Sequence, residues 1–443
     1  MRRLIYKDLL LWKNKNKRKP LILLGARQVG KTWILNEFGK KEFRNFFHID
    51  FEVNKEKLKD IFSENLLPDE LIFNLSVLLN RDIDIKHDLL IFDEIQAVPR
   101  ALTSLKYFNE KMPELTICAA GSLLGLSFSN ESFPVGKVEF MHLYPLNFEE
   151  FLLNYGEPKT YNAFLDGIKN EKSSNFIHNR ILKILKEFYI TGGLPDIVWT
   201  YLKDKNPKTL KNARNKQKDL ITSYENDFNK HSGKINSLHI SSLFNNIPIQ
   251  LSQNHNNSVK KYKFKGVIPN KKGFPDLQGP IDWLVKAGLI IKVQISNRAE
   301  IPIKGFCKEN FFKLYVFDIG ILGAMLEIPI SSILLNDYGI IKGYFAENFV
   351  AQELMAAGEK KMYSWTERNS EIEFLKIWDE KIIPFEVKAG THTQAKSLQQ
   401  YIQKYSPEEA IIFSRKNIRR KENSIVRNVP LYMVGVTKSS IYL

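Results

Sequence analysis

Residues 25–32 carry the clearest chemical pattern in this sequence. They read Gly-Ala-Arg-Gln-Val-Gly-Lys-Thr and fit G-x-x-x-x-G-K-[S/T] at every fixed position. In this pattern backbone N–H groups surround phosphate oxygens, the lysine contacts the β- and γ-phosphates, and the hydroxyl holds Mg²⁺. The sequence therefore predicts a phosphate-binding loop, and the residues expected to bind the nucleotide are Gly25, Ala26, Arg27, Gln28, Val29, Gly30, Lys31 and Thr32.

Two carboxylates further along the chain extend this chemistry. Residues 88–96 read Asp-Leu-Leu-Ile-Phe-Asp-Glu-Ile-Gln, an apolar run typical of a strand buried on both faces, which ends at Asp93 and Glu94. We expect Asp93 to hold Mg²⁺ together with Thr32, and Glu94 to orient the attacking water. The alternative is a strand followed by a solvated acidic turn. Combined with the loop, the pair predicts ATP binding and hydrolysis with Mg²⁺ as cofactor, Lys31 and Glu94 being the catalytic residues.

The segments on either side of the loop predict how it is positioned. Residues 20–24 (Pro-Leu-Ile-Leu-Leu) are typical of a buried strand, and residues 32–38 have a helical pattern that Gly39 should end. Glycines between a strand and a helix allow the backbone to curl, and the helix N-terminus adds positive potential. A chance glycine turn is the alternative, and this strand–loop–helix context argues against it.

Residues 1–150 alternate predicted strands and helices. Further strands are expected at residues 44–51, 115–121 and 137–143. Alternation of this kind predicts an α/β domain with a parallel sheet, whose ligand site lies at the carboxyl ends of the strands. Ser122 follows one of these strands, so it is expected either to sense the γ-phosphate as a catalytic residue or to serve as a turn residue.

Residues 151–235 mix charged and apolar residues at helical spacing and predict a small helical lid. Within it, residues 177–188 predict an amphipathic helix. Gly192 and Gly193 then predict a break in the chain. They are interpreted as a helix stop, with a hinge as the alternative.

Residues 236–330 predict helices at 237–244 and 281–287, followed by strands at 288–296 and 311–317. Helices followed by a β-hairpin suggest a winged helix. Residues 260–265 read Lys-Lys-Tyr-Lys-Phe-Lys, in which cations alternate with aromatic rings. Such a run can contact phosphates and stack on bases, or it can be a solvated basic loop.

Residues 331–443 predict a separate α/β module. A strand at 381–388 contains Glu386-Val387-Lys388, and the alternation of a strand places Glu386 and Lys388 on one face. Glu373 on a neighbouring strand and Glu347 on a helix can reach this face. The three carboxylates predict a Mg²⁺ or Mn²⁺ site, with Glu386 and Lys388 as catalytic residues acting on a phosphodiester. The alternative is a surface strand with alternating charge.

The composition of the whole chain limits its partners. The 443 residues carry a net charge of +16, which favours an anionic partner, nucleic acid before a membrane surface. Cys118 and Cys307 form no metal-binding or disulfide pattern. No segment approaches about 18 uninterrupted apolar residues, so we expect no membrane span and a cytoplasmic location.

Taken together, these motifs resemble those of prokaryotic AAA-type ATPases whose C-terminal half carries the domain of unknown function DUF4143. The resemblance extends over the whole chain and includes residues 93–96, 120–122, 144–151, 192–195, 343–350 and 385–388 besides the loop. It implies a P-loop AAA+ core (1–150), a helical lid (151–235), a winged helix (236–330) and a PD-(D/E)XK nuclease-like domain (331–443). Lys137 stands where relatives often have arginine, and Glu373 where aspartate is usual.

Two functions from different classes follow. The first is an AAA+ ATPase that acts on DNA through the winged helix and the nuclease-like domain. A homo-oligomer is a possible assembly for such an ATPase. The second is a nucleotide-dependent switch or scaffold whose inactive nuclease fold binds protein. Salt-sensitive DNA binding distinguishes the two, because phosphate contacts release counterions.

Overall fold

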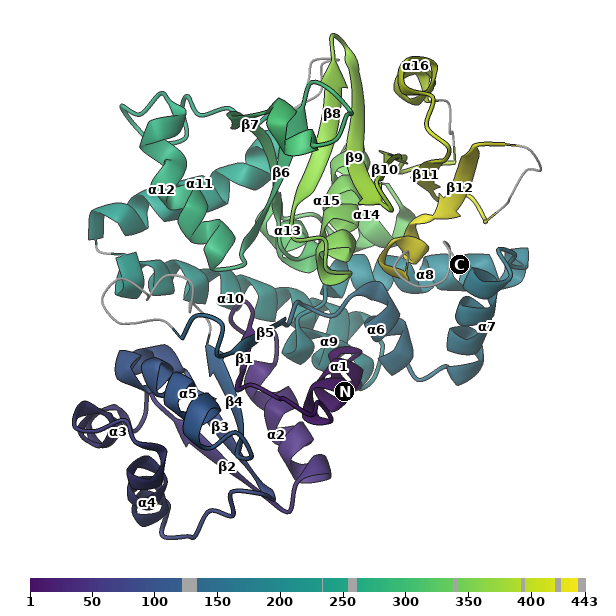
Figure 1. The fold of residues 1–443 in the computed structure, drawn as a ribbon. Helices are drawn as coiled ribbons and strands as arrows, with labels where there is room; N and C mark the ends of the chain where they lie inside the picture. The colour runs from purple at the N-terminus through teal and green to yellow at the C-terminus, as the bar shows by residue number, and fades with distance from the viewer. Residues whose placement is uncertain are drawn as a thin grey trace. The chain divides into compact units, whose positions relative to one another are not determined.

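The computed structural model describes residues 1–121, 134–232, 234–253, 261–337, 339, 341–391, 395–418 and 424–436. The chain divides into two compact units, Met1–Tyr144 and Pro145–Leu443 (Figure 1). None of the helices in the described ranges is long and apolar enough to cross a lipid bilayer.

The first unit is a parallel sheet with helices between its strands. Every pairing among its five strands is parallel, as the alternation of predicted strands and helices indicates. Its elements are α1 (Ile5–Lys13), β1 (Leu21–Leu24), α2 (Lys31–Glu42), β2 (Asn45–Asp50), α3 (Lys55–Ser63), α4 (Pro68–Leu79), β3 (Asp88–Asp93), η1 (Ile95–Ala97), α5 (Pro99–Lys111), β4 (Thr116–Gly121) and β5 (Glu139–His142).

The strand order of this sheet, β2-β3-β4-β1-β5, places β1 between strands that follow it much later in the chain. The chain leaves β1 for the sheet edge at β2, returns through β3 and β4, and then crosses β1 to reach β5. Such a reversal opens a crevice at the carboxyl ends of the strands, where open α/β sheets bind ligands. The residues that follow β1 and those that end β3 therefore lie at the ligand-binding edge.

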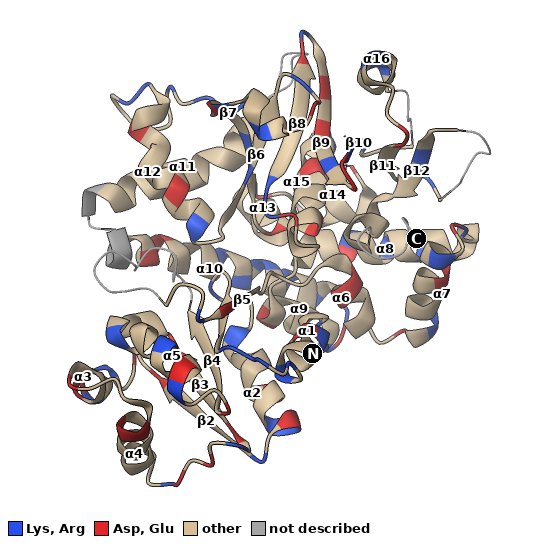
Figure 2. Ribbon diagram, viewed as in Figure 1, with Lys and Arg blue, Asp and Glu red and all other residues tan. Residues whose placement is uncertain are grey.

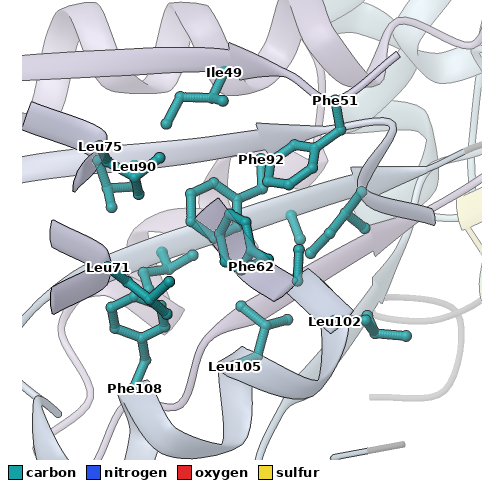
Figure 3. Packing of buried hydrophobic residues seen from close by; sticks show 14 of the residues in the cluster. Ile49, Phe51, Phe62, Leu71, Leu75, Leu90, Phe92, Leu102, Leu105 and Phe108 are labelled. Atoms are coloured by element: carbon teal, nitrogen blue, oxygen red, sulfur yellow. The ribbon is translucent and has the colours of Figure 1, made fainter. Parts of the chain in front are cut away.

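An aromatic and aliphatic core fixes β3 against the helices of the first unit (Figure 3). The rings of Phe51, Phe62 and Phe92 are fully buried. The ring centroid of Phe92 lies 5.2 Å from that of Phe51 and 6.2 Å from that of Phe62. Because Phe92 precedes Asp93 on the strand, this packing holds the position of the Asp93 carboxylate.

Helix α2 does not end at Gly39, as the sequence predicts, but continues to Glu42. A Cβ atom at Gly39 would lie 2.6 Å from the Phe46 ring. The glycine is therefore a packing residue that lets β2 approach the helix, and the prediction of a helix stop there is wrong.

The second unit begins with a helical region. The predicted amphipathic segment 177–188 lies within α8, which ends where the sequence predicts, before Gly192. These helices are α6 (Phe148–Asn154), α7 (Pro158–Lys169), α8 (Asn175–Thr191), α9 (Pro195–Leu202), α10 (Pro207–Ser232), α11 (Lys234–Gln253) and α12 (Phe274–Lys286).

Gly192 and Gly193 form a tightly packed helix end. Gly192 has a φ of 66°, and a Cβ atom there would lie 2.1 Å from a carboxylate oxygen of Asp318. The Gly193 N–H donates to the same carboxylate at 2.7 Å. These contacts support the interpretation of the pair as a helix stop.

A mixed sheet of seven strands forms the rest of the second unit, in the order β12-β11-β10-β9-β8-β6-β7. Strands β10, β11 and β12 are parallel to one another, whereas β9 is antiparallel to both of its neighbours. Its elements are β6 (Ile290–Ser296), η3 (Ile303–Phe306), β7 (Cys307–Val316), α13 (Ile319–Met325), α14 (Ile330–Leu335), α15 (Ile341–Ala356), β8 (Met362–Glu367), β9 (Ser370–Trp378), β10 (Lys381–Val387), α16 (Lys396–Tyr405), β11 (Ala410–Ser414), β12 (Val426–Pro430) and η4 (Leu431–Val436).

The β6–β7 hairpin differs from the separate wing that the sequence predicts. Strand β6 pairs with β7 on one side and, in parallel, with β8 on the other. The hairpin therefore extends the sheet of the C-terminal region, and a boundary between 330 and 331 cuts through one sheet. The hydrophobic patterns of β6 and β7 predict that these two strands form, but they do not predict that β6 also pairs with β8.

Candidate functional site

The loop before α2 has the backbone geometry that its glycine pattern predicts. Gly30 has a φ of 91° and Gln28 a φ of 67°, both in the left-handed region. A Cβ atom on Gly25 would lie 2.2 Å from the carbonyl oxygen of Leu143, so a larger residue would displace the backbone. The loop thus curls at the carboxyl end of β1, directly before the N-terminus of α2.

Lys31 is a buried cation held by neutral acceptors. Its side chain is 7 % exposed, and Nζ donates to the carbonyl oxygens of Gly25 and Ala26, both at 2.9 Å. Burial lowers the pKa of Lys31 to about 8, although the nearby Glu94 and Asp93 oppose the shift. A phosphate oxygen is a stronger acceptor than a carbonyl because it is charged. An arriving phosphate can therefore replace the carbonyl contacts.

Asp93 connects the loop helix with two strands. Its Oδ2 accepts a hydrogen bond from Thr32 Oγ1 at 2.6 Å and lies 3.0 Å from His48 Nε2. Burial raises the pKa of Asp93, but the hydrogen bonds from His48 and Thr32 outweigh burial and hold that pKa below its usual range. Asp93 is therefore ionised at neutral pH. Its hydrogen bond raises the pKa of His48 in turn.

These oxygens fit the ligand chemistry of Mg²⁺. The ion takes oxygen ligands and, in nucleotide sites, is bound through one or two side chains together with phosphate oxygens. Thr32 Oγ1 and Asp93 Oδ2 already lie within hydrogen-bonding distance of each other, so both reach one position. Thr32 and Asp93 are thus brought together as the sequence predicts.

Glu94 has an unusual backbone conformation at the end of β3. It precedes η1 with φ 49° and ψ 42°, in the left-handed region that residues with a Cβ atom seldom adopt. The Gln96 amide donates to its carboxylate. The turn and this hydrogen bond orient the Glu94 side chain, which is partly exposed at the same edge as Lys31.

Sequence reasoning missed three residues that support the site. His48 contacts Asp93, Gln96 contacts Glu94, and Arg3 holds the loop itself: its guanidinium donates to Val29 O at 3.0 Å and to Tyr144 O at 2.7 Å. Arg3 and His48 are remote from the motifs in sequence. A polar residue within the apolar β2 pattern was the only available signal for His48.

The remaining residues of the loop differ in their exposure to solvent. Ala26 and Val29 are buried, Arg27 is partly buried and Gln28 is exposed. Ser122, predicted as a sensor of the γ-phosphate or a turn residue, lies outside the described residues.

A second group of charges is buried in the second unit. Lys313 of β7, 4 % exposed, forms ion pairs with Glu371 of β9 and with Glu347 of α15, the Nζ–Oε2 distance to Glu347 being 3.8 Å. The hydroxyl of Tyr315 donates to Glu347 at 2.9 Å. Figure 2 shows acidic residues on β9 among these elements. The sequence does not predict Lys313, Tyr315 or Glu371 as members of this group.

Glu386 and Glu373 are also engaged by groups of the protein. Lys388 Nζ lies 2.5 Å from Glu386 Oε1, and Glu373 accepts the backbone N–H of Val387 at 3.0 Å. Burial raises the pKa of Glu386, Lys388 opposes this shift, and the neighbouring Glu371 and Glu347 add to it.

The predicted metal site of Glu347, Glu373 and Glu386 is not formed. No three His, Cys, Asp or Glu side chains are arranged to hold a metal ion anywhere in the described ranges. The reason is that these carboxylates are directed to lysines, a tyrosine and a backbone amide. We name the seven residues Lys313, Tyr315, Glu347, Glu371, Glu373, Glu386 and Lys388 the carboxylate–lysine cluster.

A basic groove lies elsewhere in the second unit. Lysine and arginine residues together occur on elements all along the chain (Figure 2), so the net charge alone does not locate a partner. Here, however, five lysines and several aromatic rings line one cavity of about 760 Å³, and none of the described residues that line it is acidic. Lys260 lies outside the described residues. The lining includes Lys261, Lys263, Lys265, Lys272, Lys308, Tyr262, Phe264, Phe306 and Phe311.

Comparison with protein families places these sites in three segments. Residues 17–152 match an AAA domain, residues 182–332 a domain of unknown function (DUF8612), and residues 342–434 the domain of unknown function DUF4143. The chain joins an AAA domain to a C-terminal DUF4143 domain. The resemblance inferred from the motifs is confirmed. No curated protein matches the sequence.

Several solved structures are similar to parts of this AAA–DUF4143 chain. Drosophila ORC bound to DNA has 14 % identity and a TM-score of 0.27, with 73 % of this chain and 94 % of that chain covered. A Pyrococcus horikoshii signal transduction ATPase with numerous domains and a tetratricopeptide repeat sensor has 12 % identity and a TM-score of 0.28, over 79 % of this chain and 48 % of its own. C. elegans PCH-2 has 12 % identity and a TM-score of 0.23, over 64 % of each chain. At these scores the likeness carries no conclusion about ligands or partners.

Proposed function

We propose that this protein binds ATP with Mg²⁺ at residues 25–32 and hydrolyses it: water attacks the γ-phosphorus, the bond from that phosphorus to the β–γ bridging oxygen breaks, and ADP and phosphate leave. The observation that carries the proposal is the meeting of Lys31, Thr32, Asp93 and Glu94 at the carboxyl ends of β1 and β3. The match of residues 17–152 to an AAA domain supports the same conclusion. We further expect a cytoplasmic location and self-association into a homo-oligomer.

Each residue has a separate task in this proposal. Lys31 exchanges its carbonyl acceptors for β- and γ-phosphate oxygens, and the N–H groups of the loop surround those oxygens. Thr32 and Asp93 hold Mg²⁺, which supplies charge neutralisation on the phosphates when bound. Glu94, oriented by Gln96, accepts a hydrogen bond from the attacking water and directs its lone pair at the γ-phosphorus.

The test separates binding from turnover. Glu94→Gln keeps the size of the side chain and removes its negative charge, so ATP should bind normally while hydrolysis falls by about 10²–10⁴-fold. Glu56→Gln on the exposed face of α3 is the matched control and should hydrolyse ATP at the wild-type rate. Nucleotide binding and phosphate release are measured with Mg²⁺ and with chelator. Wild-type turnover in Glu94→Gln would assign the water to another residue.

We also propose that the ATPase acts on DNA through residues 236–330, in a winged-helix-like arrangement whose hairpin is built into the larger sheet. The specific observation is the basic groove. Exposed lysines contact phosphates, and partly buried rings such as Phe306 and Phe311 can stack on bases. The competing function is a nucleotide-dependent switch or scaffold whose C-terminal module binds protein.

Two triple variants of equal charge distinguish these functions. Lys263, Lys265 and Lys272 line the groove, whereas Lys208, Lys211 and Lys218 are exposed on α10. Changing the first three to alanine should weaken DNA binding. It should also make the plot of log binding constant against log salt concentration less steep, by a slope of about three, one for each lost phosphate contact. Changing the second three should leave both unchanged. Equal effects of the two sets, or no salt-dependent binding by the wild type, would favour the scaffold.

A further inference from the structure

We propose that the Lys313 ammonium takes the place of a divalent cation in the carboxylate–lysine cluster, so that the nuclease-like module of this chain holds no catalytic metal. The nuclease-like resemblance implies a metal at these carboxylates, and the residues present do not fit one. The inference concerns the second unit alone and is independent of ATP or DNA binding.

The position of Lys313 is the first observation. Its side chain comes from β7, inside the DUF8612 match, whereas Glu347 and Glu371 belong to the DUF4143 match. Lys313 is 4 % exposed and pairs with both carboxylates. The cation therefore lies between a carboxylate of α15 and a carboxylate of β9.

The hydrogen bonds around Lys313 complete the replacement. Tyr315, two residues further along β7, donates to Glu347, and Glu373 is turned to the backbone N–H of Val387. On β10, Glu386 pairs with Lys388. Two lysines, a phenol and an amide thus supply the positive partners that a metal and its water ligands supply in a metal site.

Two of the carboxylates meet at one ammonium, so removing the charge of Lys313 leaves both without that cation. Glu347 and Glu371 share the Lys313 ammonium, and both act electrostatically on Glu386. Glu386 Oε2 is buried and, within the described part of the chain, accepts no hydrogen bond. A metal ion competing for these oxygens must lose its water and displace a cation that is covalently tethered to the site. Mg²⁺ in particular dehydrates reluctantly.

The decisive variant is Lys313→Met, which keeps the length and apolar stem of the side chain and removes the charge. The matched control is Lys376→Met on β9, since Lys376 is also 4 % exposed and, among the described residues, pairs with one glutamate, Glu359, at 3.2 Å. Thermal unfolding of the full chain is followed with Mn²⁺ and with chelator for wild type, both variants, Glu371→Gln, and Lys313→Met combined with Glu371→Gln.

Mn²⁺ should raise the Tm of Lys313→Met by about 5 °C relative to chelator, because a ligand that binds only the folded state stabilises it. Wild type and Lys376→Met should show no such shift, and the added Glu371→Gln change should abolish it. Electron paramagnetic resonance of bound Mn²⁺ gives an independent count of sites per chain.

Two results would overturn the proposal. One is a Mn²⁺-dependent rise in the wild-type Tm that Glu371→Gln removes, since this shows a metal beside Lys313. The other is a folded Lys313→Met protein that gains no Mn²⁺ site. If Lys313→Met does not fold, the proposal is tested by comparing the Mn²⁺-dependent change in Tm of wild type with that of Glu371→Gln. Equal Tm responses of these two proteins to Mn²⁺ would support the proposal.

Discussion

Lys31 in the first unit and Lys313 in the second are both buried lysines beside carboxylates, but their acceptors differ. Lys31 donates to two backbone carbonyls, whereas Lys313 forms ion pairs with two glutamates. The ammonium of Lys31 is no longer hydrated and instead donates to neutral carbonyl oxygens. These are weak acceptors, which an anion can replace. The second is neutralised by charges that belong to the protein.

The difference separates the proposed nucleotide site from a self-contained ion-pair cluster. Removing a charge from water costs free energy. Either an opposite charge of the protein or a bound ligand can offset this cost. At the loop of residues 25–32 the compensation is incomplete, which the lowered pKa of Lys31 records. In the carboxylate–lysine cluster each of the four glutamates has a protein partner. The type of partner, and not burial, is therefore what distinguishes the two lysines.

The strongest test of this comparison replaces Lys31 and Lys313 separately and compares the effects on ATP binding. Lys31→Ala should weaken ATP binding about 100-fold, because it removes charge-assisted hydrogen bonds worth about 1.5–3 kcal/mol each. Lys313→Met should leave ATP affinity unchanged. Affinity is measured with a fluorescent, non-hydrolysable ATP analogue. A similar loss in both variants would show that the second-unit lysine also supports the nucleotide site.

The next largest effect concerns the close approach at Gly25. Gly25→Ala should destabilise the first unit by about 1–3 kcal/mol, as overpacking does, and disrupt the phosphate cradle, because the new Cβ meets Leu143 O. Gly279→Ala in α12 meets nothing within 4 Å and should stabilise its helix by about 0.5–1 kcal/mol. Unfolding by denaturant measures both changes. Equal behaviour of the two variants would remove the steric argument for Gly25.

The residues of the proposed nucleotide site could be named from the sequence because the signals for them are local. The loop pattern fixes spacing over eight residues, and Asp93 and Glu94 directly follow an apolar strand run. The strands β1 to β5 also agree with prediction, since buried parallel strands are continuous apolar runs. Parallel strands then bring their carboxyl ends together without any further information.

The parts that failed depend on which distant segments become neighbours. Lys313 and Tyr315 enter the carboxylate–lysine cluster only because β7 belongs to the same sheet as β9 and β10. Strand β8, which separates β9 from the hairpin, was not predicted at all. Arg3 contacts residues 26 and 141 positions away. The hydrophobic periodicity within one segment does not indicate which distant strand or loop that segment will contact.

A smaller effect tests the state of Lys31 by pH. The pKa of Lys31 is lowered to about 8, so above that pH the free site holds a neutral amine and ATP binding must take up a proton. ATP affinity should therefore fall as pH rises, by about tenfold between pH 7.5 and 9. Lys31→Arg, whose charge does not titrate, should show no such slope. A flat wild-type profile would contradict the role of burial.

The smallest expected effect concerns the partner of Asp93. The hydrogen bond to Asp93 raises the pKa of His48 above its unfolded value. The stability from this pair is therefore fully present below the unfolded pKa of histidine, about 6.5, and is lost as pH rises through the higher folded pKa. For a partly exposed pair this is about 0.5 kcal/mol between pH 6 and 8.

His48→Gln can keep a hydrogen bond to Asp93 but does not titrate, so it should remove this part of the pH dependence of unfolding. His87→Gln is the control, since His87 pairs with Asp84 at an exposed position of the same unit. Protonated His48 also competes with Mg²⁺ for Asp93, so the Mg²⁺ concentration needed for half-maximal ATP hydrolysis should rise at low pH in the wild type and less in His48→Gln. A pH response identical in the two proteins would mean that Thr32, and not His48, is the partner that controls the Asp93 carboxylate.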